Sequence, residues 1–577
     1  GYDINSLLNL DSIEKKMKIG FKSTNGEANS INNFFDFIKY ITFLFQVKHA
    51  KVSLLIMTIG GFVAYINRVG ASSSLVNIVT KPLKIFKKNP NLAAVLVIPI
   101  GQLLFICIPS AAGLGLLLMA SAGLADERPN ILIIVADDLG YSDLGCYGGE
   151  INTPHLDALA YNGIRMTQMY NMGRCCPSRA SILTGQYPHR VGLGHMIKDI
   201  GQPGYRGSLA VEAVTSGQLM QASGYRTFLA GKWHLGTPDP TKHGFEQSYG
   251  TVKSGRHYFD PTQLDRFPQN HEPIEYQPGS FHATDATADH ALEFLEMGRE
   301  TPEKPWFLYL AFNAPHFPLH AWPEDIEKYK DRYHAGWDVI REDRLKRMKK
   351  LGVIAKDSQL SKRSLYWDWG ENVPRRNPAW DSLPRDRRGD LARRMAIYAA
   401  MVDQMDRNIG RVIDDLKTNG EFENTLIVFI SDNGACYEWD PFGFDVWSSR
   451  NNKLHWGDQL ELMGNAESYH SIGSGWSNAS NTPFRLYKHY SHEGGISMPA
   501  IVHWPGGKLP KGKVLDTPAH IIDLVPTMLE AANAEYPQQW LENSTMKLPG
   551  LSLVDLWRTG KPDDVMHKRA LFLVHQG

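Results

Sequence analysis

The 577-residue chain is poor in cysteine and carries no net charge. Its five cysteines have no paired spacing that would make a disulfide framework, although a single disulfide would fit, so cysteine content leaves the redox compartment open. Lysine plus arginine and aspartate plus glutamate number 61 each, so charge gives no reason to expect a nucleic acid or an acidic polymer as a partner. What remains is a globular chain long enough for two or more domains and a large core.

The longest apolar run lies in the N-terminal part of the chain. From Asn91 the sequence reads NLAAVLVIPIGQLLFICIPSAAGLGLLLMASAGLADERPN, with lysines before it and small residues at its end. These are the parts of an export signal, and the run is also long enough to span a bilayer. We therefore expect residues 91–126 to be a signal peptide or a membrane anchor, and the protein to be periplasmic or secreted, with membrane anchoring as the alternative. Pro99 and Pro109 argue against a buried core helix. Residues 1–90 are an N-terminal extension with two shorter apolar patches, either an added membrane segment or an upstream piece outside the working protein.

From Pro129 onward, short apolar runs alternate with helical stretches, which indicates an α/β fold. The runs are nearly continuous in hydrophobicity, as in strands of a mostly parallel sheet covered on both faces. Residues 392–420 keep an apolar stripe and stop at Asn-Gly, which predicts an amphipathic helix. The charged stretch 329–388 is expected to be a surface insertion. The predicted strands are 131–136, 226–230, 306–312, 426–430 and 500–504.

Polar side chains follow four of these strands directly. Ligands of open α/β sheets bind at the carboxyl ends of the strands, so these side chains are expected to meet at one edge. Carboxylate and amide oxygens suit Ca²⁺ or Mg²⁺ and not zinc, although an Asp-Asp pair at a strand end is also common as loop solvation or a helix cap. The residues are Asp137 and Asp138, Lys232 and His234, Asn313 and His316, and Asp432 and Asn433.

Cationic side chains accompany these carboxylates. Arg179, Lys232 and Lys488 can hold an oxyanion, and His234 and His316 can move protons near neutral pH. A divalent metal with several cations around one cavity describes a site for a tetrahedral anion, either sulfate or phosphate.

The segment RCCPSRASILTG, residues 174–185, places two cysteines at the start of a predicted helix. Pro177 fits the first turn, and Gly185 can end the helix. Cys175 would then sit just ahead of the helix N-terminus, where the helix dipole favours an anionic nucleophile. Cys176 fits a buried structural role.

Six motifs together resemble the type I, formylglycine-dependent sulfatase family, in particular its bacterial arylsulfatase branch. They are CCPSRASILTG, ADDLG, GKWHLG, APH, SDNGA and KHYSHEGG, and the resemblance covers roughly residues 128–577. It implies an alkaline-phosphatase-like α/β sandwich, with a large mixed, mostly parallel sheet flanked by helices. It also implies a catalytic domain over 127–560 and, at 561–577, the start of a truncated small C-terminal α+β domain.

The resemblance also assigns roles to the residues at the strand ends. Cys175 takes the place of the cysteine that a formylglycine-generating or sulfatase-maturing enzyme oxidises to Cα-formylglycine. The family pattern implies Ca²⁺, with Mg²⁺ as the alternative, held by Asp137, Asp138, Asp432, Asn433 and the modified Cys175. It implies catalytic roles for Cys175, Arg179, Lys232, His234, His316 and Lys488, and substrate binding by Lys232, His316 and Lys488.

The implied reaction is hydrolysis of aryl or carbohydrate sulfates to an alcohol and inorganic sulfate. One hydroxyl of the formylglycine hydrate attacks sulfur, and a sulfo-enzyme hemiacetal then collapses to release sulfate. Two alternatives remain: a phosphonate monoester hydrolase or phosphodiesterase of the same superfamily, and a non-catalytic, membrane-anchored binding protein. The tryptophans of the 436–481 loop either line a substrate cleft or pack the loop itself: Trp439, Trp447, Trp456 and Trp476.

Overall fold

A ten-stranded sheet forms the centre of the computed structural model, which describes residues 128–252, 257–269, 274–367, 374–446, 449 and 451–574. The strand order is β11-β2-β10-β9-β1-β6-β3-β4-β5, with β12 beside β2. All five predicted strands are present, and four of them, β9, β1, β6 and β3, are adjacent and parallel. The strands are β1 (Asn130–Ala136), β2 (Ile164–Tyr170), β3 (Arg226–Gly231), β4 (Gln247–Gly250), β5 (Asp265–Phe267), β6 (Trp306–Ala311), β9 (Thr425–Ser431), β10 (Ser497–His503), β11 (Lys513–Leu515) and β12 (Ala519–His520).

The mixed character of the sheet comes from β10 and β5. Strand β10 runs antiparallel to both β9 and β2, and β5 runs antiparallel to β4. The predicted strand 500–504 is therefore real but reversed relative to β9. Strand β2, which the sequence analysis did not predict, pairs with β10, β11 and β12 at this side of the sheet.

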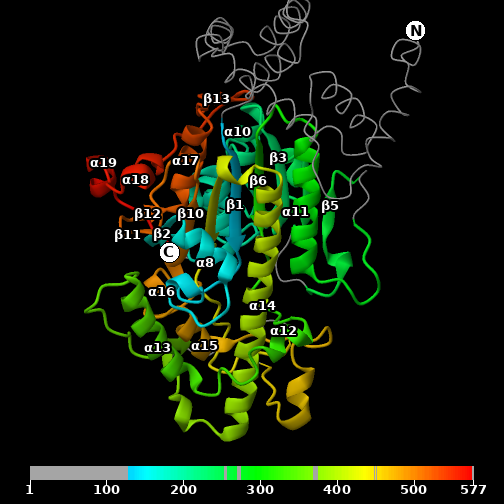
Figure 1. The fold of residues 1–577 in the computed structure, drawn as a ribbon, viewed down its shortest axis with the longest axis vertical. Helices are drawn as coiled ribbons and strands as arrows, with labels where there is room; N and C mark the ends of the chain where they lie inside the picture. Colours follow the sequence, from blue (N-terminus) through cyan, green and yellow to red (C-terminus); the bar gives the residue numbers. More distant parts are fainter. Residues whose placement is uncertain are drawn as a thin grey trace, which may run out of the picture. The chain divides into compact units, whose positions relative to one another are not determined.

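Helices cover both faces of the sheet (Figure 1). Alternate residues of β1 point to opposite sides: Leu132 and Ile134 pack in a core with α8, α11 and α14, and Ile133 and Val135 in a core with α9, α10 and α17. The helices are α8 (Pro154–Tyr161), α9 (Cys175–Thr184), α10 (Ser216–Ala222), α11 (Ala283–Arg299), α12 (Pro323–Glu327), α13 (Gly336–Leu351), α14 (Arg385–Thr418), α15 (Gly473–Ser480), α16 (Glu493–Ile496), α17 (Leu524–Ala531), α18 (Val554–Thr559) and α19 (Asp564–Lys568).

The prediction for 392–420 is confirmed by α14, which begins seven residues earlier than the sequence indicated and ends at Thr418 with Asn419 as its cap. Its apolar stripe is buried, including Tyr398 and Met401.

The expectation that 329–388 is a surface insertion is wrong for much of the segment. Trp337 of α13 and Trp380 are 1% and 2% exposed, and both rings contact Trp476 of α15. Arg344 is fully buried because its guanidinium pairs with Asp143 at 2.6 Å and with a second carboxylate. Despite its charged composition, the segment 329–388 therefore contributes aromatic side chains to a core that also includes α15.

Two small antiparallel ribbons lie outside the main sheet. Strand β7 (Leu365–Trp367) pairs with β8 (Pro374–Arg376), and β13 (Gln539–Trp540) pairs with β14 (Asn543–Ser544). The predicted N-terminal extension and export segment lie outside the described residues. Within the described part, no helix has the length and apolar character needed to cross a membrane.

Candidate active site

The carboxyl ends of four parallel strands bring the predicted site residues to one edge of the sheet. The register pairs the last residue of β1 with the last residue of β9, so Asp137 and Asp138 lie beside Asp432 and Asn433. Strand β6 lies on the other side of β1, and β3 follows it. The structure therefore gathers Lys232, His234 and His316 with these four residues.

The backbone at this edge takes conformations that side chains rarely adopt. Asp138 and His234 have φ values of 67° and 59°. A side chain at Gly231 would place its Cβ 1.9 Å from the Ala311 carbonyl oxygen, so only glycine fits the end of β3. Such strained positions concentrate at functional sites, where the surrounding structure must hold them.

Helix α9 presents Cys175 to this edge. The helix begins at Cys175, two residues before Pro177, so Cys175 is its first residue and does not lie ahead of it. Arg174 is the N-cap, and Gly185 has the left-handed conformation at the end of the helix. Cys175 is 2% exposed. The ligand atoms of Cys175, Cys176 and His234 lie within 4.8 Å of one another.

Arg179, one turn along α9, joins two carboxylates from different strands. Its Nε and Nη2 lie 2.9 and 2.8 Å from Asp432 Oδ2, and Nη2 lies 3.8 Å from Asp137 Oδ1. Its Nη1 donates to the backbone carbonyl of Lys232 at 2.9 Å, while the Lys232 ammonium donates to Asp137 Oδ2. All these side chains are fully buried.

Asp138 gathers a second set of partners. Lys488 Nζ lies 2.8 Å from Oδ1 and 2.9 Å from Oδ2, and His316 Nε2 lies 3.5 Å from Oδ2. The Asn433 amide nitrogen donates to Asp138 Oδ1 at 2.5 Å. Lys488 comes from the loop between α15 and α16, so six chain segments contribute to the site.

Two buried oxygens in this cluster have no hydrogen-bond partner among the described residues: Asp137 Oδ1 and Asn433 Oδ1. Buried oxygen acceptors without donors are costly unless a cation or water satisfies them. Ligand atoms of Asp137, Asp138 and His316 also lie within 4.8 Å of one another. The donor set fits a hard divalent cation, because it offers several oxygens at one point. The structure therefore contains a candidate metal site.

Burial and neighbouring charges shift the pKa values of Cys175 and of the groups around it in different directions. Burial lowers the pKa of His234 to about 4, so its imidazole is neutral at physiological pH and can accept a proton. The neighbouring Cys176 thiol and the charges of Lys232 and Lys488 lower the pKa of the Cys175 thiol well below its usual value. Burial opposes the charge of Lys488, but Asp138 outweighs it and raises the lysine's pKa.

A pocket of about 350 Å³ is lined by Arg174 and His489, the chain neighbours of Cys175 and Lys488, and we call it the outer pocket. Arg174 precedes Cys175 and His489 follows Lys488, so two of its walls are continuous with the site. Arg174 Nη1 lies 3.3 Å from His195 Nδ1. The lining residues are Arg174, His195, Tyr437, Trp439, His489 and Tyr490.

Most of this pocket was not predicted from the sequence. Of the four tryptophans in the 436–481 loop, Trp439 lines the outer pocket, whereas Trp476 is fully buried in the core and Trp456 is 54% exposed. Trp447 lies outside the described residues. Arg174 and His489 could have been predicted to lie near the site, because each is the chain neighbour of a predicted site residue, Cys175 or Lys488.

Comparison with known proteins identifies the family. A family model described as Sulfatase matches residues 129–534. An uncharacterized sulfatase of Schizosaccharomyces pombe is 36% identical over 76% of this chain and 81% of its own length. The chain belongs to the sulfatase family. An arylsulfatase of Klebsiella aerogenes is 33% identical over 77% of this chain and 95% of its own length. This sulfatase is accordingly a sulfuric ester hydrolase, and its reaction is the hydrolysis of sulfate esters.

Solved structures agree with the fold. The crystal structure of Ps i-CgsB superposes with a TM-score of 0.50 at 26% identity, over 74% of this chain and 76% of that one. A Bacteroides fragilis protein named as a sulfatase, yidJ, superposes with a TM-score of 0.50 at 21% identity, over 76% and 79% of the two chains. The alkaline-phosphatase-like α/β architecture is thus confirmed.

A second family model, described as C4-dicarboxylate anaerobic carrier, matches residues 6–121. This range overlaps both the predicted extension and the predicted export segment, and it lies outside the described residues.

Proposed function

We propose that this sulfatase hydrolyses carbohydrate or aryl sulfates through Cys175, after a formylglycine-generating or sulfatase-maturing enzyme has oxidised that residue to Cα-formylglycine. The observation that carries the proposal is the buried network beside Cys175, in which Arg179 joins Asp432 to Asp137 and Lys232 pairs with Asp137. Such a cage of charges suits a tetrahedral anion, and the Cys-x-Pro-x-Arg string leads directly into it.

We propose Asp137, Asp138, Asp432 and Asn433 as the ligands of Ca²⁺, with Mg²⁺ as the alternative, and the modified Cys175 as a further ligand. The unpartnered Asp137 Oδ1 and Asn433 Oδ1 support this assignment. When bound, the cation would offset carboxylate repulsion and polarise the reacting oxygens.

The side chains of the site divide the remaining work. The formylglycine hydrate would supply the attacking hydroxyl when it is present. Arg179, Lys232 and Lys488 then stabilise the negative charge of the sulfate oxygens, as preorganised cations do in a buried site. His316 Nε2, which faces the site beside Asp138, is placed to give a proton to the departing alcohol oxygen.

His234 is the base in this proposal. Neither ring nitrogen has a hydrogen-bond partner among the described residues, and its lowered pKa keeps it neutral. It can therefore take the proton whose removal allows sulfate to leave without attack of water on sulfur. Export to the periplasm or the exterior, with or without an anchor, stays a proposal based on the sequence of residues 91–126.

Two measurements test the proposal. Mass spectrometry of the peptide spanning Cys175 should show the loss of H₂S and the gain of one oxygen, which marks the aldehyde. Hydrolysis of p-nitrophenyl sulfate should exceed that of the corresponding phosphate and phosphonate esters. An unmodified thiol in protein from a host that carries the maturing enzyme, together with no sulfate hydrolysis, would overturn it.

A further inference from the structure

A second pocket, of about 300 Å³, lies outside the site described above, and we call it the basic pocket. Four permanently cationic side chains line it: Lys362, Arg363, Arg376 and Arg485. No carboxylate belongs to its lining, which otherwise consists of serine, leucine, tryptophan and histidine side chains. This is a strongly positive cavity on a chain without net charge.

The cations of the basic pocket are only partly neutralised by their surroundings. Arg363 lies 3.4 Å from Asp338, and Arg376 donates to the backbone carbonyl of Arg363. The Arg485 side chain is exposed and makes no hydrogen bond or ion pair with any described residue. Burial and the nearby Arg485 lower the pKa of His492, as expected where positive charge accumulates. The cavity therefore favours an anionic occupant.

One loop connects the basic pocket to the active site. The segment 484–492 directs Lys488 to Asp138, places His489 and Tyr490 in the outer pocket, and places Arg485 in the basic pocket. The two pockets also share an aromatic wall. Trp367 of the basic pocket stacks on Tyr490 of the outer pocket, with ring centroids 5.4 Å apart and planes at 29°.

We propose that the basic pocket binds a second anionic group, a sulfate or a carboxylate, of the same carbohydrate whose reacting sulfate lies at Cys175. The sugar between the two groups would lie along the wall formed by Trp439, Tyr490 and Trp367. This inference rests on the proposed function and specifies its substrate class: sulfated oligosaccharides that carry more than one negative charge.

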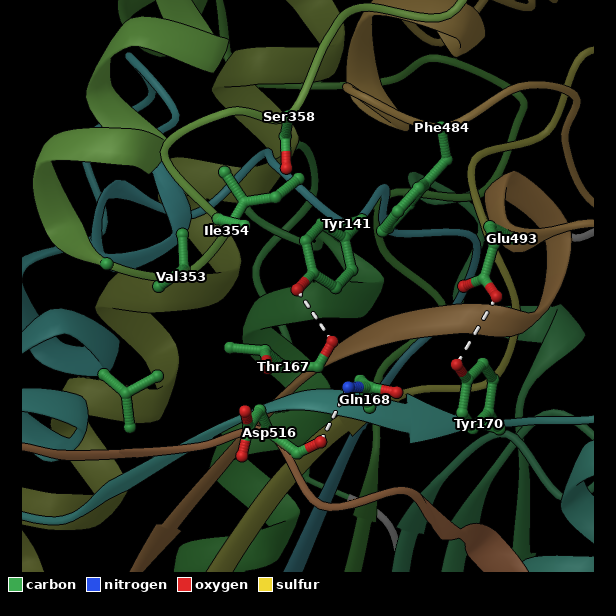
Figure 2. Close-up of a pocket in the computed structure, with 13 residues that line it drawn as sticks. Tyr141, Thr167, Gln168, Tyr170, Val353, Ile354, Ser358, Phe484, Glu493 and Asp516 are labelled. Atoms are coloured by element: carbon green, nitrogen blue, oxygen red, sulfur yellow. Dashed lines mark hydrogen bonds between the residues drawn. The ribbon is translucent and has the colours of Figure 1, made fainter.

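A separate groove, lined by residues outside both pockets, indicates the direction in which the polyanion extends. It has a volume of about 690 Å³ and carries Glu493 and Asp516, but no basic side chain lines it. Figure 2 shows the Glu493 carboxylate meeting the Tyr170 hydroxyl, 3.4 Å away. Like charges would repel a sulfated chain from this groove. The chain is therefore expected to extend from Cys175 toward Arg485 and not toward Asp516.

The test compares two substrates on the purified, formylglycine-containing enzyme. One is p-nitrophenyl sulfate, and the other is a sulfated disaccharide with a second sulfate on the adjacent sugar. For the variant Arg485→Glu, the ratio of kcat/KM for the disulfated disaccharide to that for p-nitrophenyl sulfate should fall about tenfold or more, because a charge that steers and holds an anion is reversed. Arg485→Lys should keep the ratio within about threefold, since it keeps the charge but not the planar fork. Lys346→Glu, on the exposed face of α13, is the matched charge reversal away from the pocket.

The outcomes separate the two claims. If the unaltered enzyme did not hydrolyse p-nitrophenyl sulfate, the proposed function itself would be refuted. Normal hydrolysis with an unchanged substrate ratio in Arg485→Glu would refute only the basic pocket's role. An inhibition assay compares dextran sulfate with single-stranded DNA at equal charge concentration. Equally strong inhibition by the two polymers would also refute the role of the basic pocket, because the pocket would then hold any polyanion. Arg376→Ala gives a second variant with the same expected direction.

Discussion

Replacing Lys488 with methionine is expected to weaken catalysis and at the same time to strengthen Ca²⁺ binding. The Lys488 ammonium contacts both oxygens of Asp138, which we propose as a metal ligand. The lysine therefore competes with the cation for the same carboxylate, while its charge helps to hold sulfate. The two effects of one substitution should have opposite signs.

The structure sets the expected size of each effect. A lysine and a cation that share one carboxylate are taken to be about 5 Å apart, and two unit charges at that separation interact by about 3 kcal/mol at an effective dielectric constant of about 20. Removing the lysine should therefore tighten Ca²⁺ binding by about tenfold or more, even after relaxation. Loss of a cation that stabilises the transition state should lower kcat by about 10²- to 10³-fold. In metal-free protein, Asp138 would lose its ion-pair partner in a site where it is 1% exposed. Such a loss costs about 3–5 kcal/mol, and the Asn433 and His316 contacts place this case toward the low end.

Three measurements on Lys488→Met check this reasoning: calorimetric Ca²⁺ titration, thermal unfolding with Ca²⁺ and with EDTA, and steady-state kinetics. The drop in Tm should be larger in EDTA than in Ca²⁺. Lys417→Met, an exposed lysine paired with Asp414 on α14, should change none of the three. Weaker Ca²⁺ binding in Lys488→Met, or an equal drop in Tm under both conditions, would contradict the competition between lysine and metal.

Three further predictions concern other parts of the chain. Cys175→Ala should abolish both the aldehyde and sulfate hydrolysis, whereas Cys176→Ala should keep both; retention of activity in Cys175→Ala would refute the nucleophile assignment. Burial lowers the pKa of His520 to about 3, so its contribution to stability is full above about pH 6.5 and is lost as the pH falls toward 3. The variant His520→Asn keeps a cap acceptor for the Ile522 amide but has no group that titrates in this range. The drop in its unfolding free energy from pH 7 to pH 5, measured by urea unfolding, should therefore be about 2 kcal/mol smaller than that of the unaltered protein. Trp337→Ala should lower the free energy of unfolding by about 3–5 kcal/mol, because its ring is 1% exposed, whereas the exposed Trp456→Ala should change it by less than about 0.5 kcal/mol.

The sequence predicts the central strands and the residues at their ends because both follow from local rules. Residues 131–136 and 426–430 are continuous apolar runs, and such runs in an α/β pattern make adjacent parallel strands. The carboxyl ends of parallel strands share one edge, so the meeting of Asp137 with Asp432 followed without knowledge of the strand order. The same reasoning does not give direction, which is why the reversal of β10 was visible only in the structure.

Other features depend on contacts between distant segments, and local patterns cannot reveal them. In strand β2, Arg165, Thr167 and Gln168 interrupt the apolar residues, so the strand lacks the continuous apolar run by which the other strands were predicted. The segment 329–388 was assigned to the surface from its charge, but Trp337 and Trp380 contact Trp476, which lies about 100 to 140 residues further along the chain. The outer pocket likewise combines side chains from four separate loops.

The balance of charge in the active site leads to a last prediction. Three buried carboxylates, Asp137, Asp138 and Asp432, face three cations, Arg179, Lys232 and Lys488, so their formal charges cancel. A bound Ca²⁺ would leave the site with two net positive charges, which match the two negative charges of inorganic sulfate.

Sulfate should therefore bind as a product inhibitor at least about tenfold more weakly in EDTA than in the presence of Ca²⁺, since each 1.4 kcal/mol is a factor of ten. Calorimetric titration with sodium sulfate at constant ionic strength measures this directly, and sodium chloride serves as the control because salt screens exposed charges but not a buried cage. Equal sulfate affinity with and without Ca²⁺ would mean that the lysines and the arginine hold the anion unaided, and the proposed role of the metal in the charge balance would be wrong.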